Sequence, residues 1–129
     1  MSSVPPHLKY TKEHEWIEEV SPGRYRVGIT DYAQGALGDI VYLQMPKVGE
    51  SISAGKVCGE VESTKSVSDI YTPVTGVVKE VNEKLANNPE ILNSDPYGAG
   101  WMIKLSEVNE NELSTLLDAA GYQKITETA

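Results

Sequence analysis

Several residue types are scarce in this chain, and each shortage excludes a class of protein. The 129 residues include a single cysteine, Cys58, so neither a disulfide framework within the chain nor a cluster of thiolate metal ligands is available. No stretch approaches the roughly 20 consecutive apolar residues of a membrane-spanning helix. Residues 1–7 lack the apolar core of a signal peptide. We therefore expect a cytoplasmic protein that has no contact with a membrane.

Basic residues are also scarce, which excludes a common kind of partner. Lysine and arginine number 11 against 19 aspartates and glutamates, and the net charge is −8. Such a chain has no basic stripe that could displace counterions from phosphates, so we expect no nucleic-acid partner. The acidic surface suits solubility as well as docking onto basic patches of other proteins, and composition does not separate these two uses.

What the chain does contain is a series of short β-type segments. Its length fits one domain, in which we predict a flexible tail at 1–7, a compact core at about 24–106 and a helix at about 109–120. Alternating residues on both sides of the turn sequence SPGR predict a β-hairpin over residues 15–30. Because phenylalanine is absent, the core must rest on aliphatic side chains, tyrosines and the two tryptophans.

A short helix and further strands are expected after the hairpin. Thr30 or Asp31 can cap a helix that runs through Leu37 and ends at Gly38. Over residues 39–81, short strand-like runs alternate with glycine and proline. This spacing favours a small, curved β barrel or sandwich over a parallel sheet with crossover helices.

The helix predicted at about 109–120 depends on capping signals. Asn109 can cap it, Glu112 completes a capping box, and Gly121 provides a stop. The apolar stripe of this helix consists of Leu113, Leu116 and Leu117.

One lysine stands out in the segment GEVESTKSVSDIYTPVTG, residues 59–76. Two alternating runs flank Ser63, Thr64, Lys65 and Ser66, and the three hydroxyl residues suit a tight turn between two strands. A nucleophilic lysine needs burial or a cationic neighbour, whereas this one stands among small hydroxyl residues with acidic residues nearby. The residues therefore indicate an exposed lysine on which other enzymes act.

The other polar residues form no pattern typical of a catalytic or metal site. His7 and His14 are the only histidines, no nucleophile-elbow pattern accompanies them, and we expect no metal site. Carboxylates could pair for acid–base chemistry, although so acidic a chain brings them together by chance; the candidates are Glu13, Glu15, Glu60, Glu62 and Asp69. The residues alone predict a β-rich carrier or binding module without chemistry of its own.

Four segments of the chain, in order, resemble the H-protein family of the glycine cleavage system. They are LKYTKEHEW, VGITDYAQGALGDIVYLQMPKVGESISAG, EVESTKSVSDIYTPVTGVVKEVN and NSDPYGAGWMIK, and they extend from about Leu8 towards the C-terminal helix. The resemblance implies a mainly β fold, the barrel-sandwich hybrid of lipoyl and biotinyl carriers, with short peripheral helices and a C-terminal helix. It also implies a monomeric, non-catalytic carrier rather than an enzyme.

The resemblance further implies a cofactor and a set of partners. Lipoate would be held in amide linkage on Lys65, where a separate lipoylating enzyme attaches it. The lipoyl group would carry an aminomethyl group from a pyridoxal-phosphate glycine decarboxylase (P protein) to a tetrahydrofolate-dependent aminomethyltransferase (T protein). A dihydrolipoyl dehydrogenase (L protein) would then reoxidise the dithiol.

A cleft that excludes water would preserve the loaded arm, and two acidic residues are candidates for it. We expect Glu15 and Asp69 to line this cleft and to pair with the ammonium of the aminomethyl group. Some family members carry histidine where this chain has Tyr32, so a role for an imidazole at that position is not carried over.

Other interpretations stay open at this point. A biotin carrier has methionines on both sides of its lysine, where this chain has Thr64 and Ser66. A lipoyl domain of a 2-oxoacid dehydrogenase is shorter and is followed by a flexible linker. A donor that relays lipoyl groups to other lipoate-dependent enzymes would share every feature of the shuttle. An unmodified scaffold, or a small enzyme that uses His14, would keep the fold without the cofactor.

Overall fold

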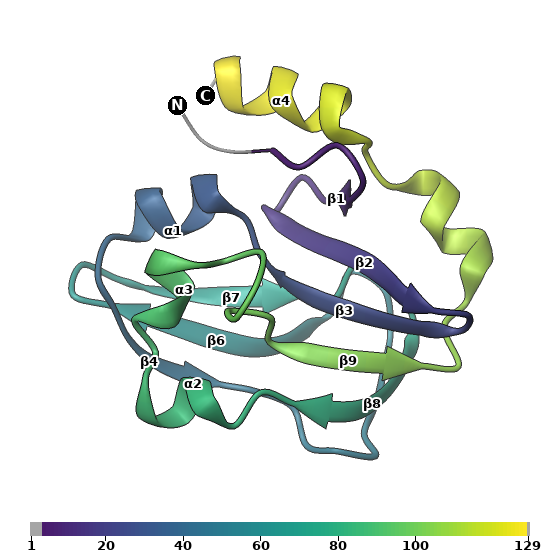
Figure 1. Ribbon diagram of the computed structural model, residues 1–129, viewed down its shortest axis with the longest axis horizontal. Coiled ribbons are helices and arrows are strands. Elements are labelled where there is room, and N and C mark those ends of the chain that lie inside the picture. The colour runs from purple at the N-terminus through teal and green to yellow at the C-terminus, as the bar shows by residue number, and fades with distance from the viewer. Residues whose placement is uncertain (1–3, 129) are drawn as a thin grey trace.

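The computed structural model, which describes residues 4–128, is built around two antiparallel β-sheets (Figure 1). The larger sheet has six strands in the order β1-β2-β3-β9-β8-β5. Their bounds are β1 (Lys9–Tyr10), β2 (Glu15–Ser21), β3 (Arg24–Ile29), β5 (Ser51–Ile52), β8 (Gly76–Val81) and β9 (Ile103–Ser106). The smaller sheet has the order β4-β6-β7 and consists of β4 (Ile40–Gln44), β6 (Val57–Ser63) and β7 (Val67–Tyr71).

Short helices lie around the two sheets. They are α1 (Asp31–Leu37), α2 (Lys84–Asn87), α3 (Ile91–Ser94), the 3-10 helix η1 (Glu110–Thr115) and α4 (Ala119–Thr128). Helices α1 and α3 lie side by side at one end of the sheets, whereas α4 lies beside the short strand β1 (Figure 1). The predicted mainly β class, with short peripheral helices and a C-terminal helix, is confirmed.

The hairpin and the first helix form where the sequence predicts them. Strands β2 and β3 pair in antiparallel register on either side of a turn at Gly23, whose φ of +77° is a conformation that glycine adopts without strain. Thr30 caps α1, because its hydroxyl accepts a hydrogen bond from the backbone N–H of Ala33 at 3.1 Å. The helix ends at Gly38, which has a φ of +82°.

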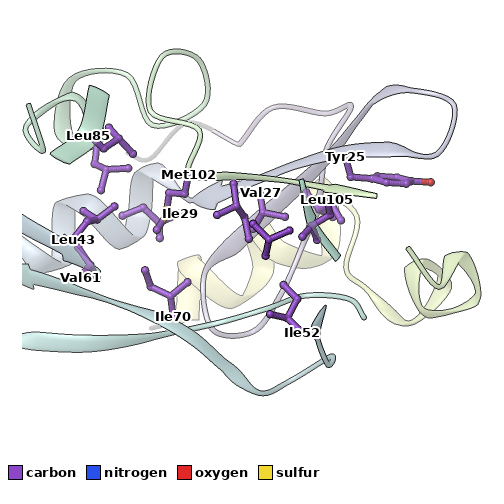
Figure 2. Close-up of a cluster of buried hydrophobic side chains, with 14 of the residues drawn as sticks. Tyr25, Val27, Ile29, Leu43, Ile52, Val61, Ile70, Leu85, Met102 and Leu105 are labelled. Carbon is purple, nitrogen blue, oxygen red and sulfur yellow. The ribbon is translucent and has the colours of Figure 1, made fainter. Parts of the chain in front are cut away.

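The main core lies between the two sheets. Val27 on β3 and Leu105 on β9 face it from the larger sheet, and Leu43 on β4 and Ile70 on β7 face it from the smaller one (Figure 2). Because alternate residues of a strand point to opposite faces, one face of each sheet supplies this apolar layer. Burial of these side chains is the main favourable contribution to folding.

A second, aromatic cluster ties both ends of the chain to the larger sheet. Tyr10, Trp16 and Tyr122 are fully buried, and the rings of Tyr10 and Tyr122 stack with a centroid distance of 4.7 Å. The predicted tail at 1–7 is only partly a tail. Residues 1–3 lie outside the described residues, but Val4 packs on this cluster and the carbonyl of Pro5 accepts a hydrogen bond from the Tyr10 hydroxyl.

The bounds predicted for the C-terminal helix, about 109–120, are wrong, because the residues expected to cap it there have other partners. Asn109 caps the 3-10 helix η1, and the Glu112 carboxylate accepts hydrogen bonds from the backbone and hydroxyl of Thr75. Leu117 then forms a β-bridge with Tyr10, which requires extended backbone. The helix therefore begins at Ala119, and Gly121, the predicted stop, lies inside it. Of the apolar stripe, the main core receives Leu113 and Leu116, and the aromatic cluster receives Leu117.

Substitution of Gly28 can test how closely the aromatic cluster packs. Gly28 pairs with Trp16 across the hairpin, and a Cβ at this position would lie 2.8 Å from the indole ring. We expect Gly28→Ala to lower the free energy of unfolding by about 1–3 kcal/mol, measured by urea denaturation. Gly35→Ala is the control, since a Cβ there meets nothing within 4 Å and helix propensity favours alanine. Equal effects of the two substitutions would contradict the packing argument.

Candidate functional site

Lys65 lies in the tight turn that connects β6 to β7. The two strands pair up to Glu62 and Val67, and the backbone N–H of Ser63 donates to the carbonyl of Ser66 at 2.8 Å. The lysine side chain is exposed. The strand pairs on either side hold both ends of the turn, so the chain presents one amine at a fixed place.

The hydroxyl of Ser63 organises this turn from the inside. Its oxygen accepts hydrogen bonds from the backbone N–H groups of Lys65 and Ser66, both at 3.1 Å. The Ser63 side chain is buried, whereas Thr64, Lys65 and Ser66 are exposed. A short hydroxyl side chain is the type that bonds to backbone two or three residues ahead, which is why such residues favour turns.

The end of α1 lies against the lysine. The backbone N–H of Thr64 donates to the carbonyl of Asp39 at 3.0 Å, and a Cβ at Gly38 would lie 3.3 Å from the Cε atom of Lys65. Glycine at position 38 therefore serves two purposes: it adopts the positive φ that ends α1, and it leaves room for the lysine stem. The sequence predicted the first purpose but gave no signal for the second.

A small cleft opens between α1 and the strands that carry the lysine turn; we term it the α1 cleft. Its volume is about 160 Å³, and apolar side chains from α1, β3, β6 and β7 form most of its lining. Leu37 is one of them and directly precedes Gly38, which lies against the Lys65 stem, although Lys65 itself does not line the cleft. Polar lining comes from Glu13, His14, Glu15, Ser68 and Asp69.

Both carboxylates predicted from the sequence, Glu15 and Asp69, line the α1 cleft, but their environments differ. Asp69 is exposed on β7, opposite Glu60 of β6. Glu15 is 2% exposed; its carboxylate accepts hydrogen bonds from the Thr11 hydroxyl at 2.7 Å and from the backbone N–H of Tyr71 at 3.3 Å. Burial raises the pKa of Glu15 to about 8, and these hydrogen bonds oppose the shift only in part.

His14 is a cleft residue to which the sequence assigned a role only in the alternative of a small enzyme. Its φ of +71° is unusual for a residue other than glycine, and its Nδ1 atom lies 2.7 Å from the hydroxyl of Tyr122. Burial lowers the pKa of His14, while the neighbouring Glu13 acts in the opposite direction. Tyr32 lies beside the imidazole, with a centroid distance of 4.8 Å. The sequence could not reveal this group, since 108 positions separate His14 from Tyr122.

Two common features that would indicate a different function are absent from the described part of the chain. Within residues 4–128, no three His, Cys, Asp or Glu side chains are placed to hold a metal ion together. No helix in that range is long and apolar enough to cross a membrane.

The buried carboxyl of Glu15 makes the stability of the fold depend on pH. Since the pKa of Glu15 is about 8 in the folded chain and about 4.5 when exposed, the folded state holds the extra proton between these values. The contribution of this group is fully present below about pH 4.5 and is lost as the pH rises through about 8.

We therefore expect Glu15→Gln to gain stability relative to the parent chain as the pH rises from about 5 to about 9, by a few kcal/mol at most. Urea denaturation across this range provides the measurement. Glu60→Gln, at an exposed position of β6, is the matched control and is expected to follow the parent chain. A constant difference between Glu15→Gln and the parent chain at every pH would contradict the assignment.

Comparison with known proteins gives one consistent result. The family described as Glycine cleavage H-protein matches residues 8–129. The glycine cleavage system H protein of Mycolicibacterium vanbaalenii is 55% identical over 126 residues, which cover 95% of this chain and 96% of that protein. That of Escherichia coli is 50% identical over 127 residues, 98% of each chain.

A solved structure agrees with the sequence relatives. The crystal structure of a glycine cleavage system H protein from Mycobacterium marinum superimposes with a TM-score of 0.85 and 43% sequence identity, and covers 94% of this chain and 97% of that one. The chain therefore belongs to the glycine cleavage H-protein family, whose members are carrier components of that system and not enzymes.

Proposed function

We propose that Lys65 carries lipoate in amide linkage and that the lipoyl arm moves an aminomethyl group between the enzymes of the glycine cleavage system. The observation that carries this proposal is the exposed lysine in a turn fixed by Ser63, beside a cleft with acidic lining. Amide formation requires an accessible amine, and recognition by a modifying enzyme requires a turn of defined shape. The β6–β7 turn offers both.

The chain itself has no group for the redox part of such a cycle. Cys58 is its one cysteine, and burial raises the pKa of this thiol to about 12, so the thiolate that exchange requires is scarce at neutral pH. Bound lipoate supplies the missing chemistry, because its dithiolane accepts the one-carbon unit and is later reoxidised by thiol–disulfide exchange. The residues of the chain present, orient and shelter the arm.

We assign the α1 cleft as the place where the aminomethyl group rests. Its ammonium would lie against Glu15 and Asp69, and the apolar lining would keep out the water that decomposes the cargo. At neutral pH the buried Glu15 is largely protonated in the empty cleft, since its pKa is about 8. A cation that enters favours the ionised form, so docking is expected to release a proton from Glu15.

The partners follow from the cargo. The enzymes that must reach Lys65 are a pyridoxal-phosphate glycine decarboxylase, a tetrahydrofolate-dependent aminomethyltransferase, a dihydrolipoyl dehydrogenase and a lipoylating enzyme. A net charge of −8 favours encounters with any partner surface that is basic. A monomer suits this role best, because a freely diffusing carrier reaches each enzyme in turn. The cytoplasmic location stays a prediction.

The role of Lys65 is tested by Lys65→Arg, which keeps the positive charge but cannot form the lipoyl amide. Intact-mass analysis after incubation with a lipoylating enzyme and lipoate is expected to show the adduct on the parent chain and none on the variant. Glycine–CO2 exchange with a glycine decarboxylase is expected to fall to the level without carrier. Lys56→Arg, at another exposed lysine, is the control and keeps both activities. An Lys65→Arg chain that supports exchange would contradict the proposal.

The role of the α1 cleft is tested by the lifetime of the aminomethyl group on the lipoylated chain. We expect Glu15→Gln to shorten this lifetime by up to about tenfold near pH 8, because a neutral amide cannot form an ion pair with the ammonium. Asp69→Asn is expected to have a smaller effect, since exposed ion pairs contribute less. Glu60→Gln, which lies across from Asp69 outside the cleft, is the control. An unchanged lifetime in Glu15→Gln would remove that residue from the assignment.

A further inference from the structure

Three side chains connect the C-terminal helix to the wall of the α1 cleft. The Tyr122 hydroxyl of α4 lies 2.7 Å from the hydroxyl of Thr30 and 2.7 Å from Nδ1 of His14. Thr30 and Tyr122 are fully buried, and His14 is half-buried and is one of the residues that line the cleft. We refer to Thr30, Tyr122 and His14 together as the tyrosine relay.

The direction of the hydrogens in the tyrosine relay follows from where the Thr30 hydrogen can go. Either oxygen of the Thr30–Tyr122 contact can donate, but the Thr30 hydroxyl accepts the N–H of Ala33 and has the Tyr122 oxygen as the acceptor for its own hydrogen, so we infer that Thr30 donates to Tyr122. Tyr122 then donates to Nδ1 of His14, and the imidazole is neutral with its hydrogen on Nε2. In the reverse direction Nδ1–H would donate to Tyr122, and the Thr30 hydrogen would lose its acceptor within the relay.

The backbone and two rings hold the imidazole in place. The carbonyl of His14 accepts the N–H of Thr30 at 3.0 Å, and its own N–H donates to Thr11 at 3.2 Å, which maintains the positive φ. The rings of Tyr32 and Tyr122 both contact the imidazole, with centroid distances of 4.8 and 5.7 Å. A left-handed conformation at a residue other than glycine persists only where surrounding contacts impose it, and such residues cluster at functional sites.

We propose that Tyr122 acts through His14 as a positioning residue of the α1 cleft and keeps the imidazole neutral, so that the cleft can hold a cationic cargo. The requirement is electrostatic. An imidazolium in the wall of a cleft of about 160 Å³ would repel an ammonium in the same space, whereas a neutral ring leaves the negative charges of the cleft to act on it. The C-terminal helix thereby becomes part of the storage site, although Tyr122 itself does not line the cleft.

The groups around His14 have opposing effects on its protonation. The titratable groups that line the cleft with it, or flank its ring, are Glu13, Glu15, Asp69, Tyr32 and Tyr122. Carboxylates favour the imidazolium, whereas burial and a hydrogen bond donated to Nδ1 favour the neutral ring. Since the acidic residues are needed to bind the cationic cargo, the hydrogen bond from Tyr122 offsets their effect on the protonation of His14.

The state of His14 can be measured without the cofactor. We expect long-range proton–nitrogen correlation spectra of the unmodified chain to show a neutral ring with its hydrogen on Nε2 at pH 7. In Tyr122→Phe, which keeps the ring stacked on Tyr10, we expect the His14 titration midpoint to rise by about one pH unit. Tyr25→Phe removes a buried tyrosine's hydroxyl bond to Glu110, away from the cleft, and is expected to leave His14 unchanged.

The consequence for the cargo is tested on the lipoylated chain and rests on the function proposed for Lys65. The lifetime of the aminomethyl group in Tyr122→Phe, relative to the parent chain, is expected to fall about threefold to tenfold at pH 6 and little at pH 8. A double variant that also carries His14→Gln cannot gain a proton at this position. In this double variant, the lifetime relative to the parent chain is expected to be the same at pH 6 and at pH 8.

The possible results separate the tyrosine relay from the lipoyl role. A His14 that is charged at pH 7 in the parent chain, or a titration that Tyr122→Phe leaves unchanged, overturns the relay. Equal lifetime ratios at pH 6 and pH 8 also overturn it, since the hydroxyl would then be merely structural. A parent chain that accepts no lipoate refutes the proposed function, and the spectra of the unmodified chain still decide whether Tyr122 keeps His14 neutral.

Discussion

One buried carboxyl links the two sheets at the end of β7 that lies away from the lysine turn. Glu15 belongs to β2 of the larger sheet, and its carboxylate accepts the backbone N–H of Tyr71 in β7 of the smaller sheet. Full burial of this group is costly, which the raised pKa of about 8 records. Hydrogen bonds from Thr11 and Tyr71 satisfy its oxygens in part and offset some of this cost.

The placement of Glu15 also orders its neighbours in the chain. Thr11 receives the backbone N–H of Glu15 on its hydroxyl oxygen, and the segment between them forms a tight turn with His14 in a left-handed conformation. His14 and Glu15 thus both line the α1 cleft although they are consecutive residues. Residues on both sides of a strand end can share a site when the backbone turns between them.

The C-terminal segment packs against the residues around this turn. Leu117 pairs with Tyr10 in extended conformation, and Tyr122 of α4 contacts Tyr10, Thr30 and His14. Helix α4 lies beside β1 (Figure 1). The helix contributes one buried hydroxyl as well as apolar surface. Through these contacts, residues beyond β9 reach a residue that lines the α1 cleft.

Local sequence by itself determined the hairpin over 15–30, helix α1 with its cap at Thr30, and the turn at Lys65, because alternation, capping and turn residues act within a few positions of one another. The identity of the family followed from four ordered segments. Tertiary structure decided the rest. Asn109 and Glu112 carried a valid capping signal, yet Glu112 bonds to Thr75 and extended pairing at Leu117 delays the helix. Likewise the burial of Glu15 and the contact of His14 with Tyr122 depend on packing between segments far apart in the chain, which no local pattern encodes.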